Sequence, residues 1–120
     1  MNYNKNNTFA KILRGEIPCK KVYENDYVLS FHDVNPQKKM HVLVIPKGEY
    51  IDLDDFHNRA SEKEIIEFNK SITHIVKVLK ISNQEAGYRV LSNIGKNGGQ
   101  EVPHLHYHIF GGEEVGKIVS

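Results

Sequence analysis

The strongest constraint on the fold is a run of seven residues near the C-terminus, His104-Leu105-His106-Tyr107-His108-Ile109-Phe110. Histidine and apolar side chains alternate along this run, which is typical of a β-strand with two different faces. Successive side chains of a strand point to opposite faces, so the three histidines share one face. We therefore predict a strand over residues 104–110 that presents three imidazoles on one side and packs its other side against a helix.

The rest of the chain predicts two helices and four more strands. A long helix is expected over residues 61–80, because Ser61 and Glu64 form a capping-box pattern and apolar residues then recur at helical spacing. A short helix is expected between Thr8 and Gly15, the latter standing where a helix-ending glycine would. Apolar runs bounded by turn residues predict strands at residues 20–24, 27–33, 41–45 and 87–94.

These elements predict an α+β domain, in which an antiparallel, meander-like sheet of about five strands carries one long helix on a face and a short N-terminal helix. The third predicted strand is a continuous apolar run, which indicates burial on both faces. A length of 120 residues suits a single domain over residues 1–120. We expect residues 1–7 to be a frayed opening and residues 113–120 to be a C-terminal tail.

Charge and composition narrow the class of partner. Sixteen Lys and Arg residues against 15 Asp and Glu residues leave a formal net charge of +1, which gives no electrostatic footprint for nucleic acid or an anionic membrane. The single Cys19 excludes an intrachain disulfide and a multi-cysteine zinc site. No stretch approaches the roughly 20 apolar residues of a membrane span, and the N-terminus lacks a signal-peptide run. We expect a cytoplasmic protein.

Three interpretations of the histidine run compete. The histidines are ordinary surface or hydrogen-bonded residues in the first, as we assume elsewhere for His32, His57 and His74. In the second they ligate a metal, with the cupin-like spacing of His106, His108 and Glu113. The glycines that flank a cupin motif are missing, so we expect no metal and no cofactor.

In the third interpretation, which we favour, the histidines act on a phosphate. A neutral imidazole near its own pKa is a good nucleophile, and its attack on phosphorus gives a covalent nucleotidyl-histidine. Flanking histidines can donate to non-bridging phosphate oxygens. The glycine-rich loop at residues 95–99 can bring backbone N–H groups close to an anion, although it is not a P-loop.

The run from His104 to Phe110 resembles the signature of the histidine triad superfamily of nucleotide hydrolases and transferases. Other segments match the family in the same order, namely residues 9–12, 16–18, 31–37, 41–47, 99–102 and 111–112. The resemblance extends from about Thr8 to Gly112 and is closest to the histidine triad nucleotide-binding proteins, which hydrolyse purine nucleoside phosphoramidates. It implies the family's fold and a two-fold homodimer that takes an AMP-type purine nucleotide.

Carried over residue by residue, the resemblance also implies a mechanism. His106 would be the nucleophile that attacks the α-phosphorus, while His104 would orient it and His108 would contact the α-phosphate oxygens. His41 matches the family's fourth histidine. Asp33 would accept hydrogen bonds from the ribose hydroxyls.

The same resemblance implies the surroundings of the nucleotide. The base would lie against Phe31 and Val34. The phosphate and leaving group would be surrounded by Asn93, Gly99, Gln100 and Glu101. From the residues alone, Asp33 is also a turn cap and Asn93 a partner of the backbone. A dinucleoside polyphosphate hydrolase, or a non-catalytic module that binds a nucleotide or a metal, remains the alternative.

Two positions depart from the family's pattern. Glu101 stands where some members have a small hydroxyl residue, and residues 115–120 lack the Trp-containing ending of some relatives. A carboxylate at this position would repel phosphate unless it turned aside, but it would attract a cationic leaving group. The leaving-group specificity of this chain is therefore open.

Overall fold

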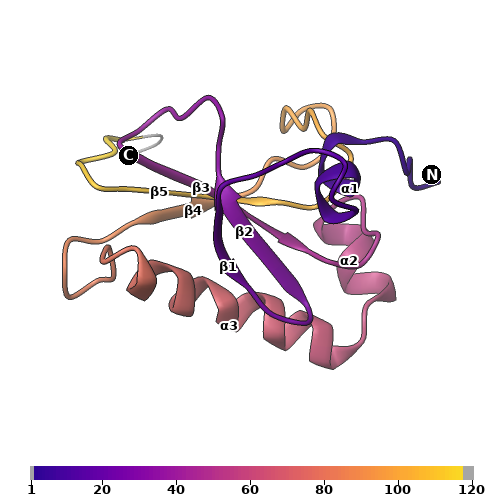
Figure 1. Cartoon of the computed structure of the whole chain (residues 1–120), viewed down its shortest axis with the longest axis horizontal. Coiled ribbons are helices and arrows are strands. Elements are labelled where there is room, and N and C mark those ends of the chain that lie inside the picture. The colour runs from indigo at the N-terminus through magenta and orange to yellow at the C-terminus, as the bar shows by residue number, and fades with distance from the viewer. Residues whose placement is uncertain (1, 118–120) are drawn as a thin grey trace.

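A five-stranded antiparallel sheet forms the centre of the molecule (Figure 1), in a computed structural model that describes residues 2–117. The elements in chain order are α1 (Thr8–Leu13), β1 (Lys21–Glu24), β2 (Val28–His32), β3 (Met40–Pro46), α2 (Leu53–Arg59), α3 (Glu62–Val78), β4 (Arg89–Leu91) and β5 (Tyr107–Gly111). The strands β1 to β3 form a meander, and β5 lies between β3 and β4 in the order β1-β2-β3-β5-β4. The predicted α+β class, with one long helix and a short N-terminal helix, is confirmed.

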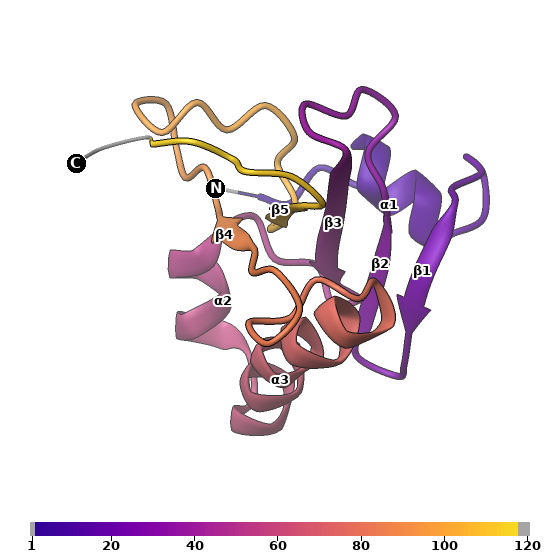
Figure 2. The same cartoon turned by 90° about the vertical axis from the view of Figure 1, so that its left-hand side faces the viewer.

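The two faces of the sheet carry two separate apolar cores. Val42 and Val44 of β3 belong to the core that includes Phe68 and Ile75 of α3. On the other face, Leu29, Phe31, Leu43 and Ile45 pack with Phe9 of α1. Figure 2 shows α1 and α3 on opposite sides of the sheet. The burial of β3 on both faces, predicted from its continuous apolar run, is confirmed because residues 41–46 are all buried.

Side chains cap the start of α3, as predicted, and the start of α1. At α3, the Ser61 side chain accepts from the Glu64 backbone N–H, and the Glu64 side chain accepts from that of Ser61. At α1, the Asn7 side chain accepts from the Ala10 N–H. Each contact satisfies a backbone donor that the first helical turn leaves unpaired.

The N-terminal segment differs from the frayed opening predicted for residues 1–7. Asn7 is only 5% exposed, and the Tyr3 hydroxyl lies 2.5 Å from His104 Nδ1. The segment is ordered because side chains far along the chain bind it, which no local pattern indicates. Of the predicted tail, residues 113–117 form no helix or strand, and residues 118–120, like Met1, lie outside the described residues.

The histidine strand is shorter than predicted and begins at Tyr107. Tyr107 pairs with Val44 of β3, so a longer ladder would bring Leu105 opposite Pro46, which has no N–H to donate. Leu105 instead donates its N–H to the Tyr50 carbonyl at 2.8 Å. Residues 104–106 therefore lie outside the sheet, and the strand begins only after the first two histidines.

The helix α2 was not expected, and His57 lies in it. Only Phe56 is buried in this helix, so its sequence shows little apolar periodicity. The available signal was the cap, because the Asp52 side chain accepts from the Asp55 N–H and two acidic residues follow in the first turn.

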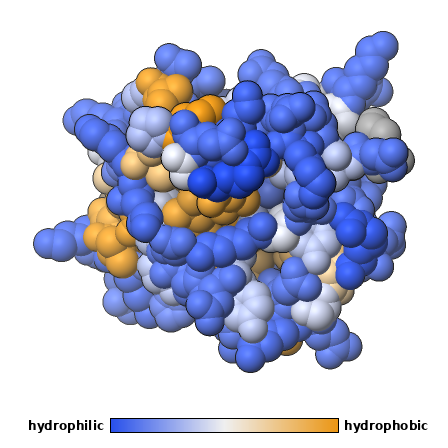
Figure 3. Space-filling view, turned by 45° about the vertical axis from the view of Figure 1, so that its right-hand side comes forward, coloured by the Kyte–Doolittle hydropathy of each residue, from blue (hydrophilic) through white to orange (hydrophobic). Residues whose placement is uncertain are grey.

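Within residues 2–117, no helix combines the length and the apolarity that a membrane crossing requires. Figure 3 shows a largely hydrophilic surface on which hydrophobic atoms occupy small, separate patches.

Candidate active site

A cavity of about 470 Å³ lies on the α1 side of the sheet, between α1, the loop after β2 and the segment that leads into β5. Its volume falls in the range of small-molecule sites. The predicted site residues that line it are Phe31, Asp33, Val34, His41, Asn93, Gly99, Glu101, His106 and His108. The structure thus brings most of the predicted site together, while His104 and Gln100 do not line the cavity.

His106 is held with one nitrogen bonded and the other free. Its Nδ1 lies 2.8 Å from the His104 carbonyl oxygen, which can only accept, so Nδ1 carries the proton. Burial lowers the pKa of His106 below its ordinary value, although the contact with the His104 carbonyl and the nearby carboxylates raise it. The ring is therefore neutral near pH 7, and Nε2 keeps its lone pair.

A chain of hydrogen bonds sets the protonation of the other two histidines. The Gln37 backbone N–H donates to His41 Nδ1 at 3.1 Å, so His41 carries its proton on Nε2. That Nε2–H lies 2.9 Å from His108 Nδ1 and donates to it. Burial, with the neighbouring histidines, lowers the pKa of His108 to about 4, so its ring is neutral and carries its own proton on Nε2.

Phe110 packs against both of these rings. Its ring lies parallel to that of His108, at an interplanar angle of 4° with centroids 5.7 Å apart, and 4.3 Å from the centroid of His41. The strand register explains the contact, since His41 pairs directly with Phe110 and lies diagonally from His108. Sequence reasoning missed Phe110, although it is the next position after His108 on the histidine face.

Asp33 caps a turn, which is one of the two roles considered for it, and keeps acceptor capacity for the other. One carboxylate oxygen accepts from the Asn35 N–H at 2.8 Å, which is the turn cap. The other lies 3.3 Å from His41 Nε2. The side chain is 19% exposed, and a carboxylate accepts about four hydrogen bonds, so it retains capacity for a hydroxyl donor.

The described residues contain one cluster with the spacing of a metal site, formed by Asp33, His41 and His108. It differs from the set considered from sequence, in which Glu113 was a member. A metal on His41 Nε2 would require the proton to move to Nδ1, where it would face the Gln37 N–H. The hydrogen bonds of His41 therefore do not fit metal ligation at this cluster.

Gln100 has a structural role in place of the predicted contact with phosphate. Its side chain accepts from the Gly95 N–H and donates to the carbonyls of Ile51 and Val102. It therefore fixes the glycine-rich loop to the body of the protein. Gly98 within this loop has no room for a side chain, because a Cβ atom would lie 2.3 Å from the Ile94 carbonyl oxygen.

Polar groups beside this loop remain free to bind an anion. Within the described part of the chain, the Asn93 side chain makes no hydrogen bond, and the backbone N–H groups of Glu101 and Val102 have no protein acceptor. All three residues line the cavity. They are neutral donors of the kind that binds a phosphate in a glycine-rich loop.

The remaining walls are apolar. Phe31 is only 3% exposed and Val34 is 88% exposed, so the first forms a buried wall and the second an open rim. The cavity also has apolar walls that sequence reasoning did not name, contributed by Ile12, Ile17, Cys19 and Leu43. Among the described residues that line it, none is Lys or Arg, and the carboxylates are Asp33 and Glu101.

Comparisons with known proteins find relatives that match nearly the whole chain. A model of the HIT domain matches residues 14–115. An uncharacterized HIT-like protein of Azospirillum brasilense is 51% identical, over 98% of this chain and 95% of the relative. The purine nucleoside phosphoramidase of Escherichia coli (strain K12) is 36% identical, over 93% of this chain and 92% of the relative.

Solved structures show the same arrangement of elements. A histidine triad protein from Clostridium difficile superposes with a TM-score of 0.83 at 40% identity, covering 99% of this chain and all of that chain. A HIT family hydrolase from Clostridium thermocellum superposes with a TM-score of 0.86 at 35% identity, covering 97% and 99% of the two chains.

Proposed function

The chain belongs to the HIT family, and we propose that it hydrolyses purine nucleoside 5′-phosphoramidates, or related AMP-linked anhydrides, through a nucleotidyl-His106 intermediate. The observation that carries the proposal is the hydrogen bond from His106 Nδ1 to the His104 carbonyl, which leaves the Nε2 lone pair free for attack. The E. coli relative, whose name gives this activity, supports the substrate class.

In the first step, His106 Nε2 forms a bond to the α-phosphorus and the bond from phosphorus to the leaving amine breaks. The leaving nitrogen takes up a proton from solvent and departs as the amine, and the attacking water gives a proton back to solvent in the second step. His108 donates its Nε2–H to a non-bridging oxygen, because its Nδ1 already accepts from His41. In the second step, water attacks the same phosphorus and the bond to Nε2 breaks, which releases AMP and restores neutral His106.

The cavity supplies the contacts that the nucleotide needs. In this proposal, Asp33 accepts from the ribose hydroxyls and the base lies against Phe31 and Val34. The phosphate lies against Asn93, Gly99 and the N–H of Glu101. These donors and the histidines provide the electrostatic stabilisation, so the steps use no metal and no cofactor.

The charge of the cavity favours an amine leaving group over a polyphosphate. A dinucleoside polyphosphate would place several further negative charges beside Asp33 and Glu101, with no Lys or Arg among the described lining residues to balance them. We expect the protein to turn over an adenosine 5′-phosphoramidate faster than a dinucleoside polyphosphate, and a comparison of kcat/KM for the two tests this.

The proposal is tested by AMP release from an adenosine 5′-phosphoramidate in excess EDTA. His106→Ala is expected to lose several orders of magnitude of activity, because it removes the nucleophile. His74→Ala, in the exposed face of α3, is the matched control and should retain wild-type turnover. Equal rates for wild type and His106→Ala would remove His106 as the nucleophile. AMP binding without turnover would indicate a nucleotide-binding module instead.

We further propose that the protein is a cytoplasmic homodimer, as the family resemblance implies. Within residues 2–117, the strand β4 is an edge strand whose one partner in the sheet is β5, and Tyr88 beside it is 38% exposed. A second copy could cover this edge. Light scattering during size-exclusion chromatography would give twice the 13.8 kDa chain mass, and a monomer mass would contradict the proposal.

A further inference from the structure

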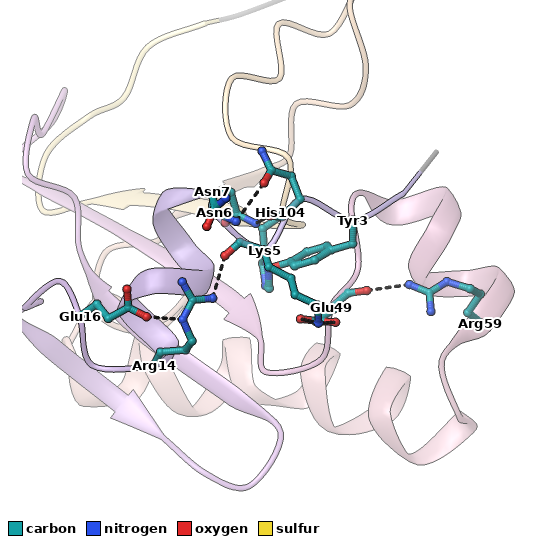
Figure 4. Close-up of polar contacts among 10 residues, drawn as sticks. Tyr3, Lys5, Asn6, Asn7, Arg14, Glu16, Glu49, Arg59 and His104 are labelled. Carbon is teal, nitrogen blue, oxygen red and sulfur yellow. Dashed lines mark hydrogen bonds and ion pairs between the residues drawn. The ribbon is translucent and has the colours of Figure 1, made fainter.

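The N-terminal segment at residues 2–7 reaches the side of the histidine site away from the cavity. The Tyr3 hydroxyl lies 2.5 Å from His104 Nδ1, and the two rings meet edge-to-face with centroids 5.6 Å apart. Figure 4 shows Tyr3 lying against His104. His104 is fully buried, and neither it nor Tyr3 lines the cavity. A ligand in the cavity would therefore not contact the Tyr3–His104 pair directly.

The direction of the Tyr3 contact follows from the other nitrogen of His104. Nε2 lies 2.9 Å from the Pro46 carbonyl oxygen, which can only accept, so Nε2 carries the proton. Burial lowers the pKa of His104 to about 4, so the ring is neutral near pH 7 and Nδ1 has a lone pair. The Tyr3 hydroxyl therefore donates to Nδ1, and both nitrogens of the buried ring have a partner.

His104 passes this constraint to His106 through its backbone. The His104 carbonyl accepts from His106 Nδ1 at 2.8 Å, and this bond selects the tautomer of His106. We propose that Tyr3 is a positioning residue of the active site: its hydroxyl fixes the ring of His104, and the His104 carbonyl then holds His106 with Nε2 free for attack. This inference rests on the proposed function.

The segment that carries Tyr3 is itself anchored, so the hydroxyl has a defined position. Lys5 forms an ion pair with Glu49 at 2.9 Å. Arg14 donates to the Lys5 carbonyl at 2.7 Å, and the Asn7 side chain donates to the Asn4 carbonyl at 2.8 Å. Figure 4 shows the Arg14 contact and the side chains of Lys5 and Glu49 beside Tyr3. These contacts tie the segment both to α1 and to the chain beyond β3.

The test is Tyr3→Phe, which removes the hydroxyl and keeps the ring that packs on His104. Loss of one buried hydrogen bond at a positioning residue is expected to lower kcat about five- to tenfold with KM unchanged. In ¹⁵N NMR of the labelled protein, the His104 Nδ1 resonance should move towards that of an imidazole nitrogen that accepts no hydrogen bond. Tyr27→Phe, which removes a hydroxyl outside the cavity lining, is the control, and both kcat and the His104 resonances should stay at wild-type values.

Each other outcome contradicts the inference in a distinct way. An unmoved Nδ1 resonance would show that Tyr3 does not bond His104, and a moved resonance with unchanged kcat would show that the bond does not serve the reaction. A change in KM or thermal stability alone would indicate a merely structural role. Wild-type protein that releases no AMP would contradict the proposed function. The nitrogen resonances test the Tyr3 contact with His104 separately, because they are measured without any substrate.

Discussion

His41 donates its Nε2–H to His108 Nδ1 across 2.9 Å, and this contact determines which nitrogen of His108 is left to act as a donor. It depends in turn on the Gln37 backbone N–H, which occupies the other nitrogen of His41. The loop between β2 and β3 therefore controls the protonation of a residue on β5, through one ring that belongs to neither the loop nor β5.

Replacing this donor should impair chemistry more than binding. In His41→Phe the ring shape is kept but nothing donates to His108 Nδ1, so the His108 proton is no longer confined to Nε2. We expect kcat for phosphoramidate hydrolysis to fall about 100-fold, as when one transition-state donor is lost, with a smaller change in KM. Steady-state kinetics test this. His74→Phe, on the exposed face of α3, should behave as wild type. A His41→Phe protein with wild-type kcat would contradict the relay.

Glu101 should select the charge of the leaving group. Its carboxylate lines the cavity and lies close enough to His106 to raise the pKa of that ring. Glu101→Ser is expected to lower the preference for a lysine-linked over an uncharged amine-linked adenosine phosphoramidate, by about fivefold in the ratio of kcat/KM values. Glu114→Ser removes an exposed carboxylate outside the cavity and should leave the ratio unchanged. An unchanged ratio in Glu101→Ser would rule out this role.

Stability should fall as the solution becomes acidic. Burial lowers the pKa of both His104 and His108 to about 4 in the folded protein, below the ordinary 6.5. As the pH falls from about 6.5 to about 4, the unfolded chain takes up protons on these rings and the folded chain does not, so the free energy of unfolding decreases. Each pKa unit of difference is worth about 1.4 kcal/mol for a buried ring such as His104.

Urea unfolding at several pH values across this range measures the slope. In His108→Asn one of the two titrating rings is missing, so the decrease in stability between about pH 6.5 and about pH 4 should be smaller than in wild type. Equal slopes in the two proteins would show that His108 takes up its proton in the folded state as readily as in the unfolded chain.

The cap of α1 should support the cavity as well as the helix. Asn7 accepts from the Ala10 N–H and is buried, and Thr8, Phe9 and Ile12 of the same helix line the cavity. Asn7→Ala should lower the free energy of unfolding by about 1 kcal/mol, the usual effect of removing an N-cap. Asn6→Ala is the control, because only its backbone is hydrogen-bonded in the described residues. Chemical denaturation of both variants measures the free energy of unfolding, and equal values for the two variants would contradict the capping role.

The parts of the fold that were predicted correctly depend on local patterns. The alternation at residues 104–110 predicted β5, although the strand begins only at Tyr107, and the capping box at Ser61 and Glu64 predicted the start of α3. The parts that were missed depend on contacts between distant residues. Tyr3 and His104 are 101 positions apart, and the Gln37 contact with His41 is made by a backbone N–H that has no side-chain signature.

Gln100 illustrates the same limit at the candidate site. Its position in the chain, beside the glycine-rich loop, is equally suited to binding a phosphate or to bracing the loop. The structure assigns it to the loop because its amide finds the Ile51 carbonyl at 2.7 Å, a partner 49 positions away. The catalytic roles of His106, His108 and His41 stay predictions until the kinetics are measured.

The alternation along β3 also bears on how such a protein can diverge. Val42 and Val44 belong to the core that holds α3, whereas His41 and Leu43 face the cavity side. Neighbouring positions of one strand therefore meet different physical demands, since one set packs the core and the other borders the cavity. A lineage can acquire a new substrate by changing the odd-numbered positions while the even-numbered ones preserve the inherited framework.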